Sequence, residues 1–218
     1  HLLLADEINR APAKTQAALL EVMQEQQVSI EGHSFPLPGP FMALATQNPL
    51  EHEGTYPLPE AQLDRFLIKV LIDYPSSVEE EMAIVSRVTR GRSTERLDVD
   101  SVDAVATPDD VLRLQTVAGE QVVDERILDY AVRLVRRTRE WGGLRVGTGP
   151  RGAIALVRTA RAFALLDGRD FVLPDDIKRA VLPVLRHRVM VAPELEMGGG
   201  GPDEVLRAIL EDVDAPRQ

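Results

Sequence analysis

The stretch HLLLADEINRAP, residues 1–12, carries the clearest signal for the fold of this 218-residue chain. Its apolar run LLLA, residues 2–5, does not alternate with polar residues, which is typical of a strand covered on both faces in a parallel sheet. Asp6 and Glu7 follow that run directly. The stretch therefore predicts an α/β domain in which a buried strand ends in two adjacent acids.

The sequence after the acids predicts more of the same domain. Asn9 and Pro12 supply a cap and a first-turn proline for a helix that runs to about Glu25. VSIEGHSFPL, residues 28–37, alternates on both sides of a turn and predicts a β-hairpin. FMALAT, residues 41–46, predicts a second buried strand. Because a helix lies between the two buried strands, we expect them to run parallel in one sheet.

The second half of the chain has a helical pattern. We expect a loop at residues 49–59, and LIKVLI at residues 67–72 is a third apolar run, followed by a domain boundary at residues 74–76. The predicted helices cover residues 60–66, 77–89, 108–118, 124–141, 150–167, 174–188 and 203–213. The chain is thus expected to hold an α/β domain over residues 1–75 and an all-helical domain over residues 76–218.

The composition narrows the classes of function. A formal net charge of −10 argues against a general surface for nucleic acid or anionic membrane, since such surfaces need clustered Lys and Arg. No apolar run approaches the roughly 20 residues of a membrane span. The chain has no cysteine, which excludes disulfides and thiolate metal sites and fits a reducing compartment. We therefore expect a cytoplasmic protein that binds no nucleic acid and does not span a membrane.

The acid pair predicts a metal site. Asp6 and Glu7 stand at the carboxyl end of a strand, which is the edge where ligands bind in open α/β sheets. Two adjacent acids repel each other unless a cation lies nearby. With Mg²⁺, one carboxylate would hold the hydrated ion and the other would orient or deprotonate a water. The alternative is that both acids lie in the first turn of the next helix, where the helix dipole favours them.

Three further polar residues make phosphoryl transfer the favoured chemistry. Asn48 follows the second buried strand, Arg65 ends a short helix, and Arg151 begins a long one. An amide that orients water and arginines that neutralise a developing phosphate charge are what this reaction needs beside a metal. Each residue also has a plainer interpretation. Asn48 could begin a turn, Arg65 could pair with Asp64 or Glu60, and Arg151 could be an ordinary first-turn arginine.

Three long stretches resemble the MoxR-type AAA+ ATPases. They are DEINRAPAKTQAALLEVMQEQQVSIEG at residues 6–32, FMALATQNPLEHEGTYPLPEAQLDRFLIKVLIDYP at residues 41–75, and GPRGAIALVRTARAFALLDGRDFVLPDDI at residues 149–177. The resemblance covers nearly the whole chain in the order of the family. It implies an α/β fold that is a partial P-loop NTPase (AAA+) parallel sheet core, followed by an all-helical lid domain.

The resemblance also implies a role for each candidate residue. LLLADE is similar to a Walker B segment, in which Asp6 helps to bind Mg²⁺ and Glu7 is the base that activates water. Asn48 in ATQNP is similar to the sensor-one residue, which positions that water near the γ-phosphate of ATP. Arg65 in LDRF resembles an arginine finger that acts on the nucleotide of a neighbouring subunit. Arg151 in GPRG resembles the sensor-two arginine.

The family resemblance further implies a motor. ATP hydrolysis would drive chaperone-like remodelling, or insertion of a cofactor, in a partner protein. The subunits would form a homo-oligomeric ring, expected to be a hexamer, and a von Willebrand factor A-domain protein is an expected partner. The hairpin at residues 28–37 would face the pore or partners. One residue departs from the pattern, because Gly149 stands where the family often has a serine that caps the helix.

One part of an ATPase is absent from the sequence. No GxxxxGK[ST] motif occurs in the 218 residues, so the loop whose backbone amides would hold phosphates is missing. We expect that the chain is truncated and binds ATP poorly by itself. Two alternatives stay open: a related ring motor such as a magnesium-chelatase-like subunit or a helicase, and an adaptor without a P-loop that assembles with ATPases.

Overall fold

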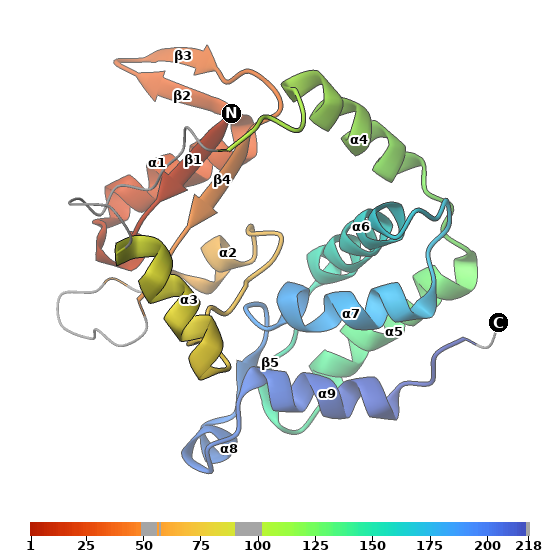
Figure 1. The fold of residues 1–218 in the computed structure, drawn as a ribbon. Helices are drawn as coiled ribbons and strands as arrows, with labels where there is room; N and C mark the ends of the chain where they lie inside the picture. The colour runs from red at the N-terminus through yellow and green to blue at the C-terminus, as the bar shows by residue number, and fades with distance from the viewer. Residues whose placement is uncertain (49–55, 57, 90–101, 217–218) are drawn as a thin grey trace. The chain divides into compact units, whose positions relative to one another are not determined.

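The structure is a computed structural model, which describes residues 1–48, 56, 58–89 and 102–216. The chain divides into two compact units, one of His1–Lys69 with Pro108–Gln218 and one of Val70–Thr107 (Figure 1). Each unit is described by itself. Most of the loop expected at residues 49–59 lies outside the described residues, and the domain boundary expected at residues 74–76 stays a prediction.

The first strand and the sheet are as predicted. Strand β1, Leu2–Ala5, pairs with β4, Met42–Ala45, and the two run parallel in register. Helix α1, Ala13–Glu25, lies between them in sequence and ends at the predicted residue. The crossover from β1 through α1 to β4 therefore confirms a parallel sheet.

Two details of this region differ from the prediction. Neither β1 nor β4 is covered on both faces as predicted, since Leu2 and Leu4 of β1 are 70% and 62% exposed, and Met42 and Leu44 of β4 are 51% and 46% exposed. The reason is that, among the described residues, only β1 and β4 form this sheet. Asn9 does not cap α1 either, because it lies inside a short 3-10 helix, Ile8–Arg10, and Pro12 takes the cap position.

The hairpin is confirmed. Strands β2, Gln27–Ile30, and β3, His33–Pro36, pair antiparallel around a two-residue turn. Both turn residues have positive φ, 52° at Glu31 and 81° at Gly32. This is the backbone twist that two-residue hairpin turns require, and glycine adopts it without steric cost.

The connection after the sheet is less regular than predicted. Helix α2, Glu60–Leu63, is shorter than the predicted helix over residues 60–66. The third apolar run begins at Leu67 without a strand, and its side chains there are exposed. Its Lys69 amide instead donates a hydrogen bond of 2.8 Å to the carbonyl of Pro183.

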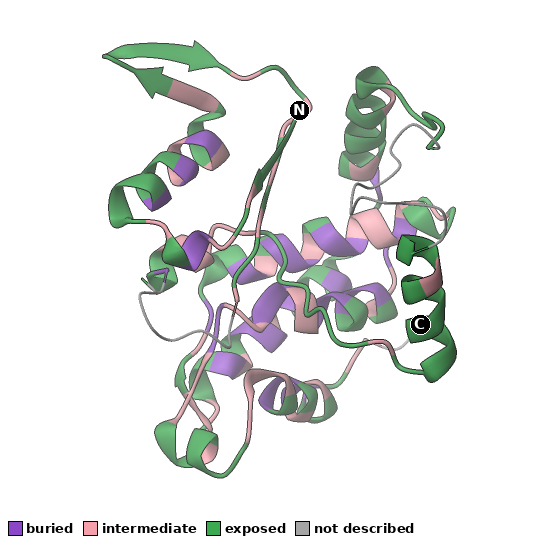
Figure 2. Ribbon diagram, turned by 60° about the vertical axis from the view of Figure 1, so that its left-hand side comes forward, coloured by how far each residue is buried: buried purple, intermediate pink, exposed green. Residues whose placement is uncertain are grey.

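Residues 108–216 form the helical part of the first unit. Its helices are α4 (Pro108–Glu120), α5 (Glu125–Glu140), α6 (Pro150–Leu166), α7 (Pro174–Leu185), α8 (Pro193–Met197) and α9 (Pro202–Asp212). Several begin with the proline that the sequence offers as a first-turn residue. The main core lies here, between α5, α6, α7 and α9, and Figure 2 shows buried positions concentrated in these helices.

The predicted helices of this part are confirmed, although α7 ends at Leu185 and not at residue 188, and the structure adds the short helix α8 and a pair of strands. A short antiparallel pair joins β5, Leu144–Val146, to β6, Met190–Val191. These strands could not be predicted from the sequence, because two or three residues are too few for a periodic signal. The pair holds the chain before α6 against the chain after α7.

The second unit contains helix α3, Val78–Thr89, which lies within a predicted helix. The carboxylate of Glu80 accepts hydrogen bonds from the backbone N–H and the hydroxyl of Ser76, both at 2.9 Å. These bonds lower the pKa of Glu80. They fix the start of the helix, as capping interactions do. No helix in the described parts of either unit is long and apolar enough to cross a membrane.

Candidate functional site

The acid pair lies at the carboxyl end of the parallel strands. Asp6 and Glu7 follow β1 directly, and the backbone pairing with β4 continues past both strands. The amide of Thr46 donates to the carbonyl of Ala5 at 3.0 Å, and the amide of Ile8 donates to the carbonyl of Thr46 at 3.0 Å. The segment that carries both acids is therefore held against the end of the neighbouring strand.

A single hydroxyl binds both acid residues. Thr46 Oγ1 accepts a hydrogen bond of 2.9 Å from the backbone N–H of Glu7 and donates one to the carboxylate of Asp6. Thr46 is not among the residues predicted from the sequence. The sequence does contain a signal for it, since Thr46 is the first polar residue after the second apolar run, as Asp6 is after the first.

Glu7 has an unusual backbone. Its φ of 47° and ψ of 48° are left-handed, a conformation that a non-glycine residue adopts rarely and that concentrates at functional sites. Its carboxylate pairs with Arg10, with Oε2 3.1 Å from Nε, and its side chain is 38% exposed. Helix α1 begins only at Ala13, so the acids do not lie in its first turn as the alternative proposed.

Asn48 is brought to the same edge of the sheet. The side-chain amide of Asn9, which is buried, donates to the carbonyl of Asn48 at 3.3 Å. A second buried amide, that of Gln16, donates to the carbonyls of Ile8 and Tyr56 at 3.3 Å and 2.9 Å. Two amides from the first helical segments therefore fix the chain on which the acids and Asn48 lie. Asn9 has this role in place of the predicted cap.

Arg65 follows α2 and makes none of the ion pairs that the plainer interpretation expected. Among the described residues it pairs with neither Asp64 nor Glu60, and its Nε donates to the carbonyl of Ala61 at 3.2 Å. Its Nη1 is buried without a hydrogen-bond partner in the part of the chain that the structure describes. The Arg65 guanidinium thus keeps hydrogen-bonding capacity that the described residues do not use.

Asp64, the residue before Arg65, binds two arginines of the helical part. Its Oδ2 lies 3.3 Å from Nη1 of Arg151, and its Oδ1 lies 3.0 Å from Nε of Arg188. The described residues show no hydrogen bond or ion pair from Arg65 or Arg151 to the acid pair. The predicted site residues therefore fall into two groups, the acids with Asn48 and the two arginines near Asp64.

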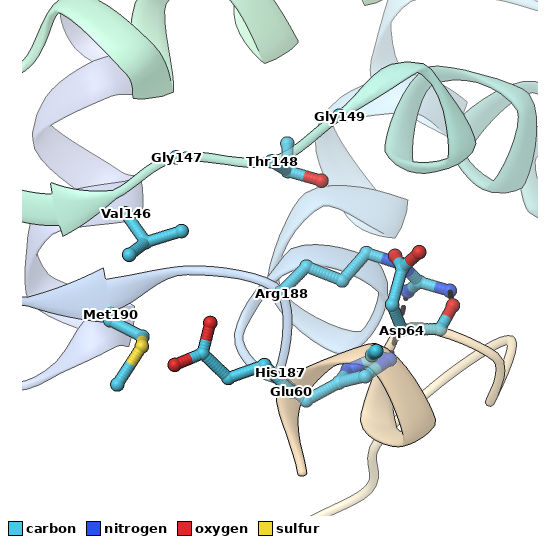
Figure 3. Close-up of a pocket in the computed structure, with 10 residues that line it drawn as sticks. Glu60, Asp64, Val146, Gly147, Thr148, Gly149, His187, Arg188 and Met190 are labelled. Carbon is cyan, nitrogen blue, oxygen red and sulfur yellow. Dashed lines mark hydrogen bonds and ion pairs between the residues drawn. The ribbon is translucent and has the colours of Figure 1, made fainter.

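A cavity of about 200 Å³ lies beside the second group (Figure 3). Its lining includes Glu60, Asp64, Thr148, His187 and Arg188. Small-molecule sites usually measure about 300–1,000 Å³, so this one is small for a nucleotide. Burial and the adjacent charge of Arg188 lower the pKa of His187 to about 4. The ring is therefore neutral at physiological pH.

Asp6 is the described side chain best suited to a magnesium ion. No group of three or more His, Asp or Glu side chains capable of holding a metal occurs in the described residues. Mg²⁺ does not need such a cage, since it is commonly bound through one or two carboxylates, waters and substrate phosphates. An exposed carboxylate oriented by a hydroxyl, as Asp6 is by Thr46, fits that mode of binding.

Two family models match the chain. A model of the ATPase family associated with various cellular activities (AAA) matches residues 1–68, and a model of the AAA lid domain matches residues 136–209. The first range contains the acid pair, Asn48 and Arg65. The second contains Arg151.

Known proteins and structures are similar over the full chain. The protein "Chaperone MoxR1" of Mycobacterium tuberculosis is 43% identical over 226 residues, which cover 100% of this chain and 58% of that protein. YeaC of Bacillus subtilis is 43% identical over 218 residues, covering 100% and 66%. A crystal structure of a Cytophaga hutchinsonii protein described as a candidate ATPase has a TM-score of 0.89 at 39% identity, covering 99% and 66%.

The chain spans between 58% and 66% of the length of the three proteins. Magnesium-chelatase subunits are also similar but more distant, and the 38 kDa subunit of Acidiphilium rubrum is 32% identical over 217 residues, covering 95% of this chain and 58% of that subunit.

Proposed function

Because this chain belongs to the MoxR-type AAA+ ATPases, we propose that the complete protein hydrolyses ATP at the carboxyl end of β1 and β4. The expected fold, a partial AAA+ sheet core followed by a helical lid, is confirmed. One observation carries the proposal. The acids Asp6 and Glu7 follow β1 directly and are bound to Thr46 at the end of the parallel neighbouring strand.

In this proposal each residue at the edge of the sheet has one task. Asp6 would hold Mg²⁺, which would supply positive charge to the phosphate oxygens of ATP. Glu7 would accept the proton of the attacking water, and its strained backbone would aim the carboxylate. Asn48 would orient that water. The support is their common position, since two of the three are fixed by Thr46 and the third by Asn9.

The arginines would act on charge that develops in the transition state. Arg65 would serve as an arginine finger for the nucleotide of the next subunit, which requires a ring, expected to be a hexamer. The Arg65 guanidinium makes no ion pair with any described residue, which supports a role outside its own chain. Arg151 would sense the nucleotide through the lid, and its present partner Asp64 would then have to release it.

The work of the motor would be chaperone-like remodelling of a partner protein or insertion of a cofactor into it. The name of the M. tuberculosis relative, a chaperone, supports this class of activity. The proposed partner is a von Willebrand factor A-domain protein. The proposed location is the cytoplasm. The magnesium-chelatase alternative is weaker, because those relatives are more distant.

Mixed rings of the complete protein test the proposal. We expect Arg65→Ala to lose most ATP turnover, since the neighbour's site would lack its finger, and Glu7→Gln to lose it because no base remains. Mixing the two variants should restore part of the turnover, because Glu7→Gln subunits bring intact fingers to intact Glu7 sites. No loss in either variant, or no recovery on mixing, would contradict the proposal.

The sequence upstream of His1 decides between an ATPase and an adaptor. A GxxxxGK[ST] motif roughly 60 to 70 residues before the acid pair would supply the phosphate loop and support the ATPase. A reading frame that encodes no such motif would favour an adaptor that assembles with ATPases without hydrolysing ATP.

A further inference from the structure

The segment that carries Arg65 is held by one buried arginine of the lid. The side chain of Arg188 is only 3% exposed, and its Nε lies 3.0 Å from Oδ1 of Asp64. Its Nη2 donates to the carbonyls of Asp64 and Phe66 at 3.0 Å and 2.6 Å. Its Nη1 donates to the carbonyl of Leu67 at 3.1 Å and to that of Val184 in α7. Arg188 therefore binds the residues on both sides of Arg65.

The two residues before Arg188 bind the same segment. Nε2 of His187 lies 2.9 Å from the carbonyl of Phe66. Arg186 Nη1 donates to the carbonyl of Lys69 at 3.4 Å, and the amide of Lys69 donates to Pro183. Three consecutive side chains after α7 thus contact the segment from Asp64 to Lys69.

Arg186 is itself anchored in the lid. Its Nη2 and Nε lie 2.7 Å and 3.0 Å from the two carboxylate oxygens of Asp203, in the first turn of α9. A bidentate pair of this kind fixes the plane of the guanidinium. Arg186 therefore contacts the Arg65 segment from a side-chain position that Asp203 fixes.

The contacts of Arg188 supply the hydrogen bonds that the short helix α2 lacks. A helix of four residues has too few internal hydrogen bonds to hold its own shape. The carbonyls of Asp64, Phe66 and Leu67, which follow it, accept hydrogen bonds from Arg188 in place of helical ones. A guanidinium offers five donors in a fixed plane, which suits a set of converging carbonyls, and its charge is favourable at the carboxyl end of a helix. A lysine has one compact charge and cannot reach all of these acceptors.

We propose that Arg188 is a positioning residue for Arg65, through which the lid sets the geometry of the arginine finger. This rests on the proposed function, in which Arg65 acts on the nucleotide of the neighbouring subunit. Arg188 does not touch that nucleotide. It binds Asp64, Phe66 and Leu67, the residues that flank Arg65. A movement of the lid would therefore move Arg65 as well.

Mixed rings of the complete protein test the inference with Arg188→Lys. The variant keeps the charge opposite Asp64 and loses the planar set of donors. We expect its ATP turnover to fall by about tenfold to a hundredfold, the loss typical of a misplaced catalytic group, while its own affinity for ATP is unchanged. Mixing with Glu7→Gln subunits should restore turnover, because those subunits carry intact fingers. Mixing with Arg65→Ala subunits should restore no turnover, because both kinds of subunit then lack a working arginine finger.

The matched control is Arg169→Gln in the same lid. Arg169 is 22% exposed and pairs with Asp176 at 2.7 Å, but it makes no contact with residues 64–69 among those described. We expect it to lower the unfolding temperature and to leave turnover per folded ring unchanged. Arg188→Lys subunits must be folded to be restored by Glu7→Gln, so recovery on mixing excludes a loss through unfolding.

Three results would overturn the inference. Turnover of Arg188→Lys equal to that of wild type would do so, as would a loss that Glu7→Gln subunits do not restore, or recovery on mixing with Arg65→Ala. Failure of the proposed function looks different. In that case Arg65→Ala itself would keep full turnover, and the role of the finger would fall together with that of Arg188.

Discussion

The backbone N–H of Glu7 donates a hydrogen bond of 2.9 Å to the hydroxyl of Thr46, 39 residues away. The same hydroxyl donates to the carboxylate of Asp6. One side chain at the end of β4 therefore orients both acids at the end of β1. The geometry of the proposed site depends on this bridge between two strands, as much as on the acids themselves.

Removing that bridge should reduce catalysis. Thr46→Val keeps the size of the side chain and deletes the hydroxyl, so the amide of Glu7 and the carboxylate of Asp6 each lose a partner. We expect turnover of the complete protein to fall by about 10–100-fold, as for other residues that orient metal ligands, and more Mg²⁺ to be needed for half-maximal rate. Thr46→Ser, which retains the hydroxyl, is the control. Equal rates and Mg²⁺ dependence in Thr46→Val and wild type would refute this role.

Gly147 is required by packing between β5 and α6. A Cβ at this position would lie 2.6 Å from backbone atoms of Thr138 and Arg139 in α5, which cannot move aside as a side chain can. We expect Gly147→Ala to lower the free energy of unfolding by about 1–3 kcal/mol or more, measured by urea unfolding of the 218-residue chain.

A neighbouring glycine provides the control for that measurement. A Cβ at Gly149 would meet no atom within 4 Å, and Gly149 is the N-cap of α6. Gly149→Ser would add the capping hydroxyl that the family often has, so stability should be unchanged or rise by a few tenths of a kcal/mol. Equal destabilisation by both substitutions would show that the backbone contact at Gly147 does not matter.

His187 should make the fold less stable in mild acid. Burial and the charge of Arg188 lower its pKa from the ordinary 6.5 to about 4. The unfolded chain therefore binds the proton more tightly than the folded chain. The contribution to stability is complete above about pH 6.5 and is lost as the pH falls toward about 4.

Unfolding in urea at pH 7 and pH 5 measures this effect. We expect the wild-type chain to lose about 2 kcal/mol more than His187→Phe between these two pH values. Carboxylates titrate over the same range, but they do so in both proteins and cancel in the comparison. The same loss in both proteins would mean that His187 titrates normally.

The chain by itself should bind ATP weakly. Its 218 residues contain the acids but no GxxxxGK[ST] loop, and backbone amides of that loop are the main phosphate ligands of such proteins. Isothermal titration of the 218-residue chain with ATP and Mg²⁺ should give little or no heat of binding. Affinity in the low micromolar range would show that the described residues suffice.

Local signals in the sequence were enough for most of the fold. The end of α1, the hairpin and the start of α6 follow from periodicity, turn residues and first-turn prolines, each of which acts over a few neighbours. The burial of β1 was predicted wrongly, because the exposure of Leu2 and Leu4 depends on what else packs on the sheet. No local pattern contains that information.

The candidate site was predictable in its parts but not in its arrangement. The acids and Asn48 could be placed at one edge, since the carboxyl ends of parallel strands meet there. The ion pair between Asp64 and Arg188 joins residues 124 positions apart, and neither residue stands in a pattern that points to the other. The sequence likewise does not show that Arg65 and Arg151 form a group separate from Asp6, Glu7 and Asn48.

The most direct test of the account is the ATP turnover of the complete protein with Glu7→Gln, measured together with its affinity for ATP. The substitution keeps the shape of the side chain and removes the proposed base. Glu211→Gln, at an exposed position of α9, is the matched control and should behave as wild type. The account predicts that Glu7→Gln abolishes turnover and leaves ATP binding intact. Turnover near that of wild type would contradict it.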